Sequence, residues 1–504
     1  MSPELPQEIW DFIASFLSDK HLWQIRELNR WLWDAAWNRQ CKLVYLDAEK
    51  LQSKAYMWNA RRLRNPMVAT RVRELAFGNG EHHASLITDT LLAASDRGYR
   101  ETLKSHLQDI YIWKPGPLKE IVKSFENLRS IRVSAIQSHD AAGQISPLDS
   151  SIHSLIGMVS STLRSLTIAV LPFANITTLL THTHLPQLEH FSITFSSLTG
   201  DNTGALFQST LQATVIPFLD RHRASIISLE VISTALAIEY DITSIFSNLQ
   251  AFPHLQSLTF SPTSTKEADA RSLRHFLSKH SACLQSLTLL IPHDSRPGGE
   301  SSITTLLPLM NAPLPHLRKM VIEMRRVREP KIPLPYLTDF IRVYAAHLTQ
   351  LQIRQRVLTT DDWRVFSTMN WAQLRYLNLH LYILTPEVIN VLSMKFPNLE
   401  TLELEVVLVV SSWSKEISSE DNLNQIGIVK QRKNRLTCLT VHGRYTRPEI
   451  IRDIVDAFPH LVLINGMPRR DVEDQATQDL LGQTGDRRQG DELSTPHALS
   501  DSGL

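Results

Sequence analysis

The stretches Leu374-Arg375-Tyr376-Leu377-Asn378-Leu379 and Leu399-Glu400-Thr401-Leu402-Glu403-Leu404 share one pattern, in which the first, fourth and sixth residues are leucine. The last three positions alternate apolar, polar and apolar residues, which is the period of a half-buried strand. Clear copies of the pattern also begin at Leu163, Leu255 and Leu284, and more divergent ones begin at Val72, Leu107, Leu128, Leu188, Ile226, Leu317, Leu348, Leu436 and, in truncated form, Leu461. The pattern therefore predicts a long series of short strands.

A helix is predicted between consecutive strands, because the copies are spaced widely enough for one strand, one helix and two connections. Over 446–458 a threonine cap, a proline in the first turn and an apolar stripe predict one such helix. Thr385-Pro386-Glu387 opens another, which Pro397 closes. One strand-helix unit cannot bury its own apolar faces, whereas stacked units can. The sequence thus predicts an α/β solenoid with a parallel sheet.

This repeat resembles the leucine-rich repeat from Val72 to Ile464, which implies an irregular horseshoe with a parallel concave sheet. It departs from that family at the turn after each strand. The positions where the family has asparagine are occupied by Leu171, Ser196, Thr263, Pro292, Arg325, Arg356 and Tyr382. Without an asparagine ladder, the backbone groups at these turns need other partners. The alternative is a non-solenoid α/β domain in which the leucine spacing is coincidental.

Residues 1–45 lack the repeat and have the periodicity of short helices. After Pro6, a first helix is predicted with apolar residues at Ile9, Ile13 and Leu17, together with Phe16. A second stretch carries Leu22, Ile25, Leu28, Trp31 and Leu32, and a third begins at Ala35. So small a unit can hardly bury this many large apolar groups by itself. A partner surface is therefore expected.

The order Leu5-Pro6, Glu8-Ile9, Ile13, Phe16-Leu17, Asp19, Leu22 and Trp31 resembles the F-box, although Asn29-Arg30 replaces the more usual Ser-Lys. The resemblance implies that this module binds a Skp-family linker protein, and through it a cullin. Carried over by position, the contact residues would be Leu5, Pro6, Ile9, Ile13, Leu17, Leu22, Ile25, Leu28 and Trp31. The alternative is a helical cap for the solenoid that binds nothing.

An F-box followed by leucine-rich repeats resembles the fungal-type F-box/LRR substrate receptors. The expected organisation is an F-box at 1–45, a helical linker at 46–70, the solenoid at 71–467 and a disordered tail at 468–504. The resemblance implies the substrate-recognition subunit of an SCF-type (Skp-cullin-F-box) E3 ubiquitin ligase for an unknown protein substrate. The alternative is a leucine-rich-repeat interaction scaffold with no ligase role.

The target surface is predicted on the later strands, where the residues that flank the buried strand positions are larger and more polar than those of the early strands. The candidates are Arg354, Tyr376, Asn378, His380, Glu403, Glu405 and His442. For any one of these residues, a solvated strand position without a binding role is the alternative.

Composition and motifs point away from several classes of function. The 52 Lys and Arg balance 51 Asp and Glu, so no global field favours nucleic acid or an anionic membrane. Cys41, Cys283 and Cys438 have no metal-ligand spacing. No phosphate-binding loop, metal-binding helix or nucleophile elbow is present, so we expect no cofactor and a non-catalytic adaptor. Without a secretory leader, a cytoplasmic or nuclear location is expected.

Overall fold

The computed structural model describes residues 6–47, 61–78, 116–134, 147–169, 173–195, 203–233, 242–261, 267–291, 307–308, 310–324, 334–409, 435–443, 458–465 and 467–472. The chain divides into two compact units, Met1–Ser264 and Thr265–Leu504. Several predicted features lie outside the described residues: Leu5, the repeat at Leu107, the helix over 446–458 and the tail beyond 472.

Unit 1 begins with a module of three helices, α1 (Gln7–Phe16), α2 (Asp19–Ile25) and α3 (Arg30–Lys42), with a short 3-10 turn, η1 (Arg26–Leu28), before α3. Ser18 caps α2 by accepting a hydrogen bond from the backbone N–H of His21 at 3.3 Å. The predicted second stretch, which ran to Leu32, is wrong. Asn29 divides it, because its side chain accepts from the Leu32 N–H at 2.8 Å and so starts α3.

The strands of unit 1 lie in chain order and pair in parallel. They are β1 (Leu43–Asp47), β2 (Glu74–Gly78), β3 (Ser130–Ser134), β4 (Ser165–Ala169), β5 (His190–Phe195), β6 (Ser228–Ser233) and β7 (Ser257–Phe260). All but β1 follow a predicted copy of the repeat. Strand β1 was not predicted, and it follows α3 without a break, so the sheet begins before the expected solenoid boundary at 71.

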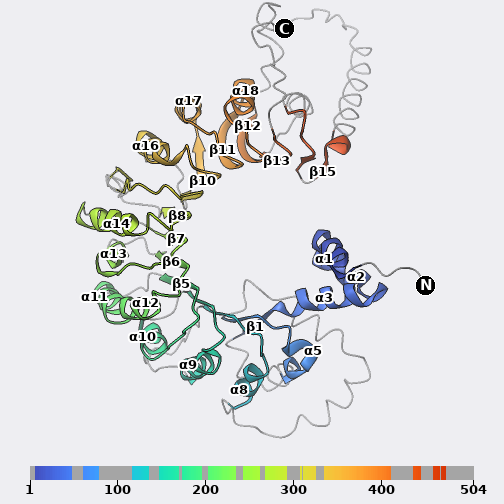
Figure 1. Ribbon diagram of the computed structural model, residues 1–504, viewed down its shortest axis with the longest axis vertical. Coiled ribbons are helices and arrows are strands. Elements are labelled where there is room, and N and C mark those ends of the chain that lie inside the picture. Colours follow the sequence, from blue (N-terminus) through green and yellow to red (C-terminus); the bar gives the residue numbers. More distant parts are fainter. Residues whose placement is uncertain are drawn as a thin grey trace, which may run out of the picture. The chain divides into compact units, whose positions relative to one another are not determined.

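The helices of unit 1 that follow the three-helix module lie along one face of these strands (Figure 1). They are η3 (Arg61–Arg64), α5 (Pro66–Ala69), α8 (Gly116–Lys123), α9 (Pro147–Val159), α10 (Phe173–Thr181), α11 (Thr203–Thr210), the π-helical turn η4 (Leu211–Val215), α12 (Ile216–His222) and α13 (Ile245–Asn248). The π turn ends two residues before Pro217, which lacks the N–H that a regular helix would use there.

Unit 2 repeats the arrangement, with helices α14 (Glu267–Lys279), α16 (Leu334–Tyr344), α17 (Thr360–Ser367) and α18 (Pro386–Lys395) along one face of its strands (Figure 1). The strands again follow chain order: β8 (Ser286–Ile291), β9 (Lys319–Met324), β10 (Gln350–Leu358), β11 (Tyr376–Leu384), β12 (Thr401–Val409), β13 (Cys438–Gly443), β14 (Leu463–Ile464) and β15 (Met467–Pro468). Pairing is parallel except between β14 and β15. Both units thus have the predicted α/β solenoid organisation.

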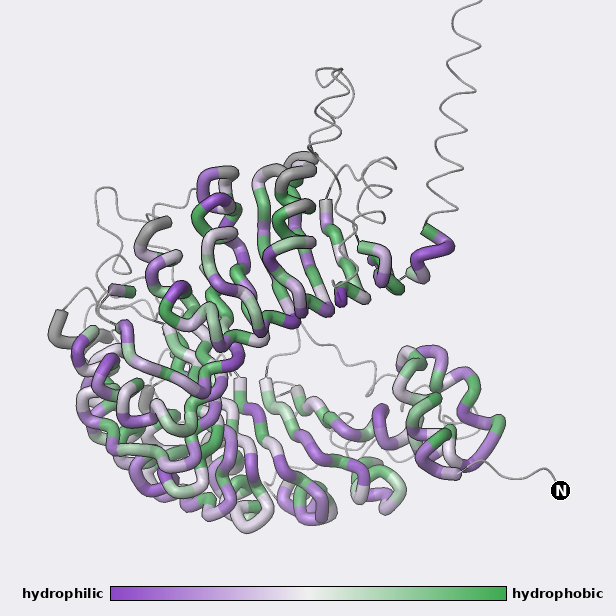
Figure 2. Tube along the Cα trace, turned by 45° about the horizontal axis from the view of Figure 1, so that its top comes forward, coloured by the Kyte–Doolittle hydropathy of each residue, from purple (hydrophilic) through white to green (hydrophobic). Residues whose placement is uncertain are grey.

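The repeat residues form the core. In one copy, Leu163, Leu166 and Ile168 are fully buried, and the leucines of the copies that begin at Leu374 and Leu399 are buried in the same way. Hydrophobic and hydrophilic residues alternate along the strands (Figure 2). The apolar set faces the helices, and the polar set lies on the opposite side of the strands, which we call the open face. The predicted helix start at Thr385 is confirmed, since its side chain caps α18.

Buried polar rings tie neighbouring repeats together. The His222 Nε2 accepts a hydrogen bond from the Leu185 N–H at 2.9 Å, while its Nδ1 lies 2.7 Å from the Phe218 carbonyl oxygen. Nδ1 must therefore carry the proton of a neutral imidazole. In unit 2, the Tyr344 hydroxyl donates to the Ala312 carbonyl at 2.9 Å, and this burial raises the pKa of Tyr344 to about 12.

The His222 tie predicts that unit 1 becomes less stable in mild acid. Burial lowers the pKa of His222 below its ordinary value of 6.5, so the unfolded chain binds a proton there before the folded chain does. Stability should therefore fall as pH drops below 6.5, by at most about 1.4 kcal/mol per pH unit for this group, until the folded pKa is passed. Chemical denaturation followed between pH 7.5 and 5.5 measures this slope.

The variant His222→Gln should show a smaller slope, although it starts from a lower stability because the Leu185 N–H loses its ring acceptor. His182→Gln, at an exposed position in the repeat that contains Leu185, is the control and should keep the wild-type slope. Equal slopes in all three proteins would show that protonation of His222 does not contribute to the pH dependence of the free energy of unfolding.

Candidate functional site

Helix α1 carries apolar side chains on two sides. One side packs on the core of the helical module, which is built around Ala14, Leu22, Leu32 and Ala36 with Trp10 and Leu17 against it. The other side exposes three large side chains: Ile9 by 42%, Phe12 by 62% and Phe16 by 73%. A surface helix needs only one apolar side to pack on its own protein. We call the second side the outer face of α1.

The two phenylalanines of the outer face form a pair. Phe12 and Phe16 lie one helical turn apart, with ring centroids 4.7 Å apart and ring planes at 85°, an edge-to-face arrangement. Exposed apolar groups that are contiguous, rather than scattered singly, mark interaction surfaces. The pair therefore presents one preformed aromatic ridge to solvent.

The predicted linker-contact residues differ in accessibility. Pro6, Ile9 and Leu28 are exposed, Leu28 by 74%, whereas Ile13, Leu17, Ile25 and Trp31 are half-buried. Leu22 is only 1% exposed and belongs to the core of the module, so as folded it cannot contact a partner. Phe12 and Phe16 were not among the predicted contacts. Their spacing from Ile9, at three and seven residues, is the sequence signal that identifies them.

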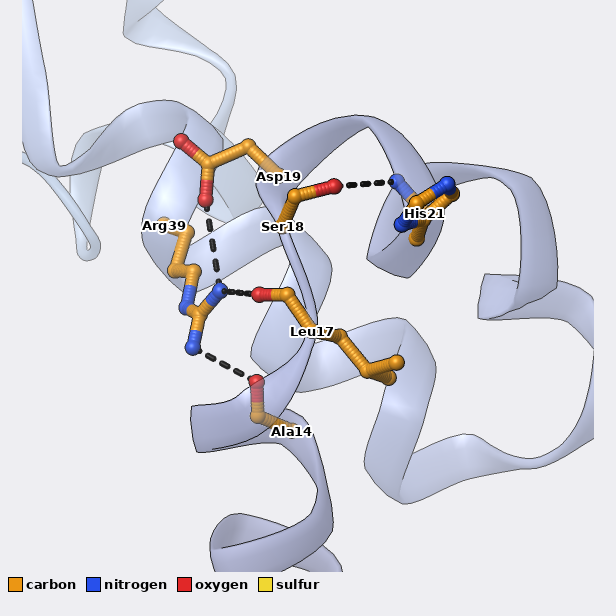
Figure 3. A network of polar contacts seen from close by, with 6 residues as sticks. All are labelled: Ala14, Leu17, Ser18, Asp19, His21 and Arg39. Carbon is orange, nitrogen blue, oxygen red and sulfur yellow. Dashed lines mark hydrogen bonds and ion pairs between the residues drawn. The ribbon is translucent and has the colours of Figure 1, made fainter. Parts of the chain in front are cut away.

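Arg39 of α3 holds the end of α1 in place (Figure 3). Its guanidinium donates to the carbonyl oxygens of Leu17 at 2.7 Å and Ala14 at 2.6 Å, both at the end of the helix, where carbonyl groups lack the partners of a continuing helix. The Ala14 carbonyl also accepts from the Leu17 N–H at 3.1 Å. The same group lies 3.3 Å from the Asp19 carboxylate at the start of α2. One side chain thus joins all three helices and fixes the direction of the outer face.

Removal of this guanidinium should loosen the module. We expect Arg39→Ala to destabilise α1 by about 1–3 kcal/mol, because two carbonyl groups and a carboxylate lose a charged donor. Hydrogen exchange of the α1 amides measures the change. Arg30→Ala, at an exposed position on the same helix, is the control and should leave the exchange unaltered. Equal protection in the two variants would contradict a bracing role for Arg39.

The module is joined directly to the sheet of unit 1. Helix α3 ends at Lys42 and β1 begins at the next residue. An Arg71 nitrogen lies 2.7 Å from the Asp34 carboxylate of α3, and the Arg73 N–H donates to the Lys42 carbonyl at 3.0 Å. Covalent continuity and these polar contacts together leave little room for a hinge between the outer face of α1 and the first strands.

Three predicted target-binding residues come together on the open face of β11 and β12. The Tyr376 hydroxyl and the Asn378 amide both donate to Glu403 Oε2 at 2.6 Å. Burial and then the Glu403 hydrogen bond raise the pKa of Tyr376 to about 12. Asn378 lies opposite Glu403 in the parallel register.

The remaining predicted target residues surround this group. His380 lies opposite Glu405 on β12, with its Nδ1 3.7 Å from the carboxylate, and His442 lies opposite Glu405 from the β13 side. Arg354 is exposed on β10 and pairs in register with Glu323 of β9. The candidate target surface thus runs across neighbouring strands of unit 2.

The described residues offer neither a metal site nor a membrane-spanning helix. No group of three or more His, Cys, Asp or Glu side chains is placed there to hold a metal ion. None of the helices in those ranges is both long and apolar enough to cross a bilayer. Cys41 is buried, which raises the pKa of its thiol to about 11 and disfavours the reactive thiolate.

Comparison with known proteins identifies no family. No family model and no curated protein matches the chain. Among solved structures, a chain in the crystal structure of a Rad7 and Elc1 complex in yeast is similar, with 14% sequence identity and a TM-score of 0.40 over 81% of this chain and 89% of that one. So distant a likeness says nothing about what this chain binds.

Proposed function

We propose that this chain is the substrate-recognition subunit of an SCF-type E3 ubiquitin ligase. In this proposal α1 to α3 are the F-box, the outer face of α1 docks on a Skp-family linker protein, and the linker binds a cullin. The observation that carries the proposal is the exposure of Ile9, Phe12 and Phe16 on a helix whose opposite side already fills the module core.

The outer face of α1 leaves large apolar side chains in contact with water. Full burial of one large apolar side chain is worth about 1.5–3 kcal/mol, so covering the outer face would contribute several kcal/mol to association. Edge-to-face packing already orders Phe12 and Phe16, which reduces the entropy lost on docking. A cap that serves only the solenoid has no need of this ridge, because its own packing uses the other side of α1.

The proposed role needs no catalytic residue in this chain. An adaptor accelerates transfer by holding a target lysine near the ubiquitin carrier, which raises its effective concentration. The continuous passage from α3 into β1 suits that task, since it holds the outer face of α1 in a fixed direction relative to the first strands of unit 1.

Co-expression with a Skp-family linker and a cullin tests the proposal. We expect the chain to retain the cullin on an affinity resin only when the linker is present. If the chain captures neither the linker nor the cullin, the proposal is contradicted. The chain would then be a leucine-rich-repeat scaffold without a ligase role.

A further inference from the structure

Three adjacent strands of unit 2 are longer than the repeat requires. Strands β10, β11 and β12 each have nine residues, whereas their neighbours β9 and β13 have six. At Arg356 and Tyr382, where the resembled family turns the chain with asparagine, the strand continues instead. The extension adds Leu381, Leu384 and Val406 to the buried core and places further residues between them on the open face.

The extension adds exposed apolar groups to the open face. Tyr382 is 45% exposed and Val407 is 40% exposed. Tyr382 follows Leu381 on β11, and Val407 follows Val406 on β12. Because Leu381 and Val406 lie opposite each other in the register, Tyr382 and Val407 lie at the same level on neighbouring strands. An aromatic and a β-branched residue side by side form a small apolar platform on a strand surface.

Two carboxylates, Glu405 and before it Glu403, lie next along the open face of β12. Glu403 is oriented by the two hydrogen bonds to its Oε2, and the Glu405 side chain is 63% exposed. In the part of the chain that the structure describes, neither forms an ion pair with a lysine or arginine. Burial lowers the pKa of His380 more than Glu405 raises it, so near pH 7 the imidazole is neutral and leaves the Glu405 charge uncompensated.

We propose that Tyr382, Val407, Glu403 and Glu405 form an acid-aromatic patch that binds an extended target segment carrying a lysine or arginine next to an apolar residue. The cation pairs with the two carboxylates, and the apolar side chain lies on Tyr382 and Val407. An acidic or phosphorylated segment would meet charge of its own sign here. Only the description of the bound segment as a degradation target rests on the proposed function.

Arg354 sets the polarity of the surface. It lies on β10, across β11 from the carboxylates. Its positive charge lowers the pKa of Tyr376, against the larger effects of burial and Glu403. Positive charge on the β10 side and negative charge on the β12 side would orient a bound segment, because the reverse placement brings like charges together.

Fluorescence anisotropy with short synthetic peptides tests the patch. The probe is an extended peptide that alternates arginine with leucine, compared with a glutamate-leucine peptide and an arginine-serine peptide. We expect the full-length wild-type chain to prefer the arginine-leucine peptide. Glu405→Lys should weaken that binding by about tenfold or more and improve binding of the glutamate-leucine peptide.

Glu230→Lys is the matched control. Glu230 occupies the repeat position of Glu403, but on β6, a strand of six residues without the extension. It should keep the affinity of the wild type within about twofold. The proposal is overturned if no peptide binds, if the three peptides bind alike, or if both lysine variants lose affinity equally.

Linker binding measured in the same variants separates the two proposals. If Glu405→Lys and the wild type retain a Skp-family linker but neither discriminates between peptides, only the acid-aromatic patch is rejected. Peptide discrimination without linker binding would instead reject the ligase role and leave the patch as a recognition site.

Discussion

Phe12→Glu and Phe16→Glu should each weaken binding of a Skp-family linker by about 30-fold or more. Each substitution places a carboxylate where a large apolar side chain would be covered. Truncation of an anchor of this kind commonly costs about 2 kcal/mol or more of the binding free energy. Both positions are well exposed in the free chain, so the fold should not change. Isothermal titration of the purified variants with the linker measures the loss.

Leu206→Glu supplies the control for this experiment. Leu206 is 51% exposed on α11 of the same unit, so the substitution adds the same charge at another apolar surface position. We expect it to bind the linker like the wild type. If all three variants bind equally well, the outer face of α1 is not the docking surface.

Asp362→Ala should reduce the stability of the α17 region by about 3–5 kcal/mol, because it removes the carboxylate that faces a buried guanidinium. Arg356 Nη2 lies 3.9 Å from Asp362 Oδ2, with the arginine side chain 3% exposed. Burial lowers the pKa of Arg356, and the Asp362 charge opposes that effect. Asp362 also accepts from the Thr359 N–H at 2.9 Å in the capping box of α17.

Hydrogen exchange of the α17 amides measures this loss, and Asp361→Ala is the neighbouring control. The Asp361 side chain is 88% exposed, and in the described part of the chain it pairs with Arg364, at 3.1 Å, one turn further along α17. Removal of a surface pair of this kind changes stability by about 1 kcal/mol at most. Equal effects of the two substitutions would mean that the buried pair contributes nothing beyond charge at the helix start.

The strands were predictable from the sequence because burial on one face imposes a strict period of two. Leu377, Leu379, Leu402 and Leu404 show why: each is buried, and a shift by one residue would expose them all. Strand β1 escaped prediction because Leu43-Val44-Tyr45-Leu46 is a short apolar run without a period of two, and no turn residue separates it from α3. Periodicity alone cannot separate a short apolar strand from the helix that it continues.

The docking site was predicted only in part. An apolar stripe in a sequence does not show whether it faces the core of its own protein or solvent. The predicted contacts therefore include the buried Leu22 and omit the exposed Phe12. The distinction depends on how α2 and α3 pack, which Asn29 and Arg39 determine through contacts with backbone groups. Such contacts leave no periodic signal in the sequence.

The target surface shows a similar limit. Alternation along the strands identifies Tyr376, Asn378 and Glu403 as outward residues, and the structure brings them into one hydrogen-bonded group. The extension of β11 and β12 beyond the repeat was not predicted, because the leucine-rich-repeat resemblance places a turn at Tyr382. Pairing with neighbouring strands carries the chain past that point.

Oxidative side-chain footprinting of the free chain and its linker complex tests the docking claim most directly. The modification rates of Phe12 and Phe16 should fall strongly when the linker binds, while that of Leu206 stays constant. Unchanged rates at both phenylalanines in a chain saturated with linker would contradict the account, because the linker would then be held by some other surface.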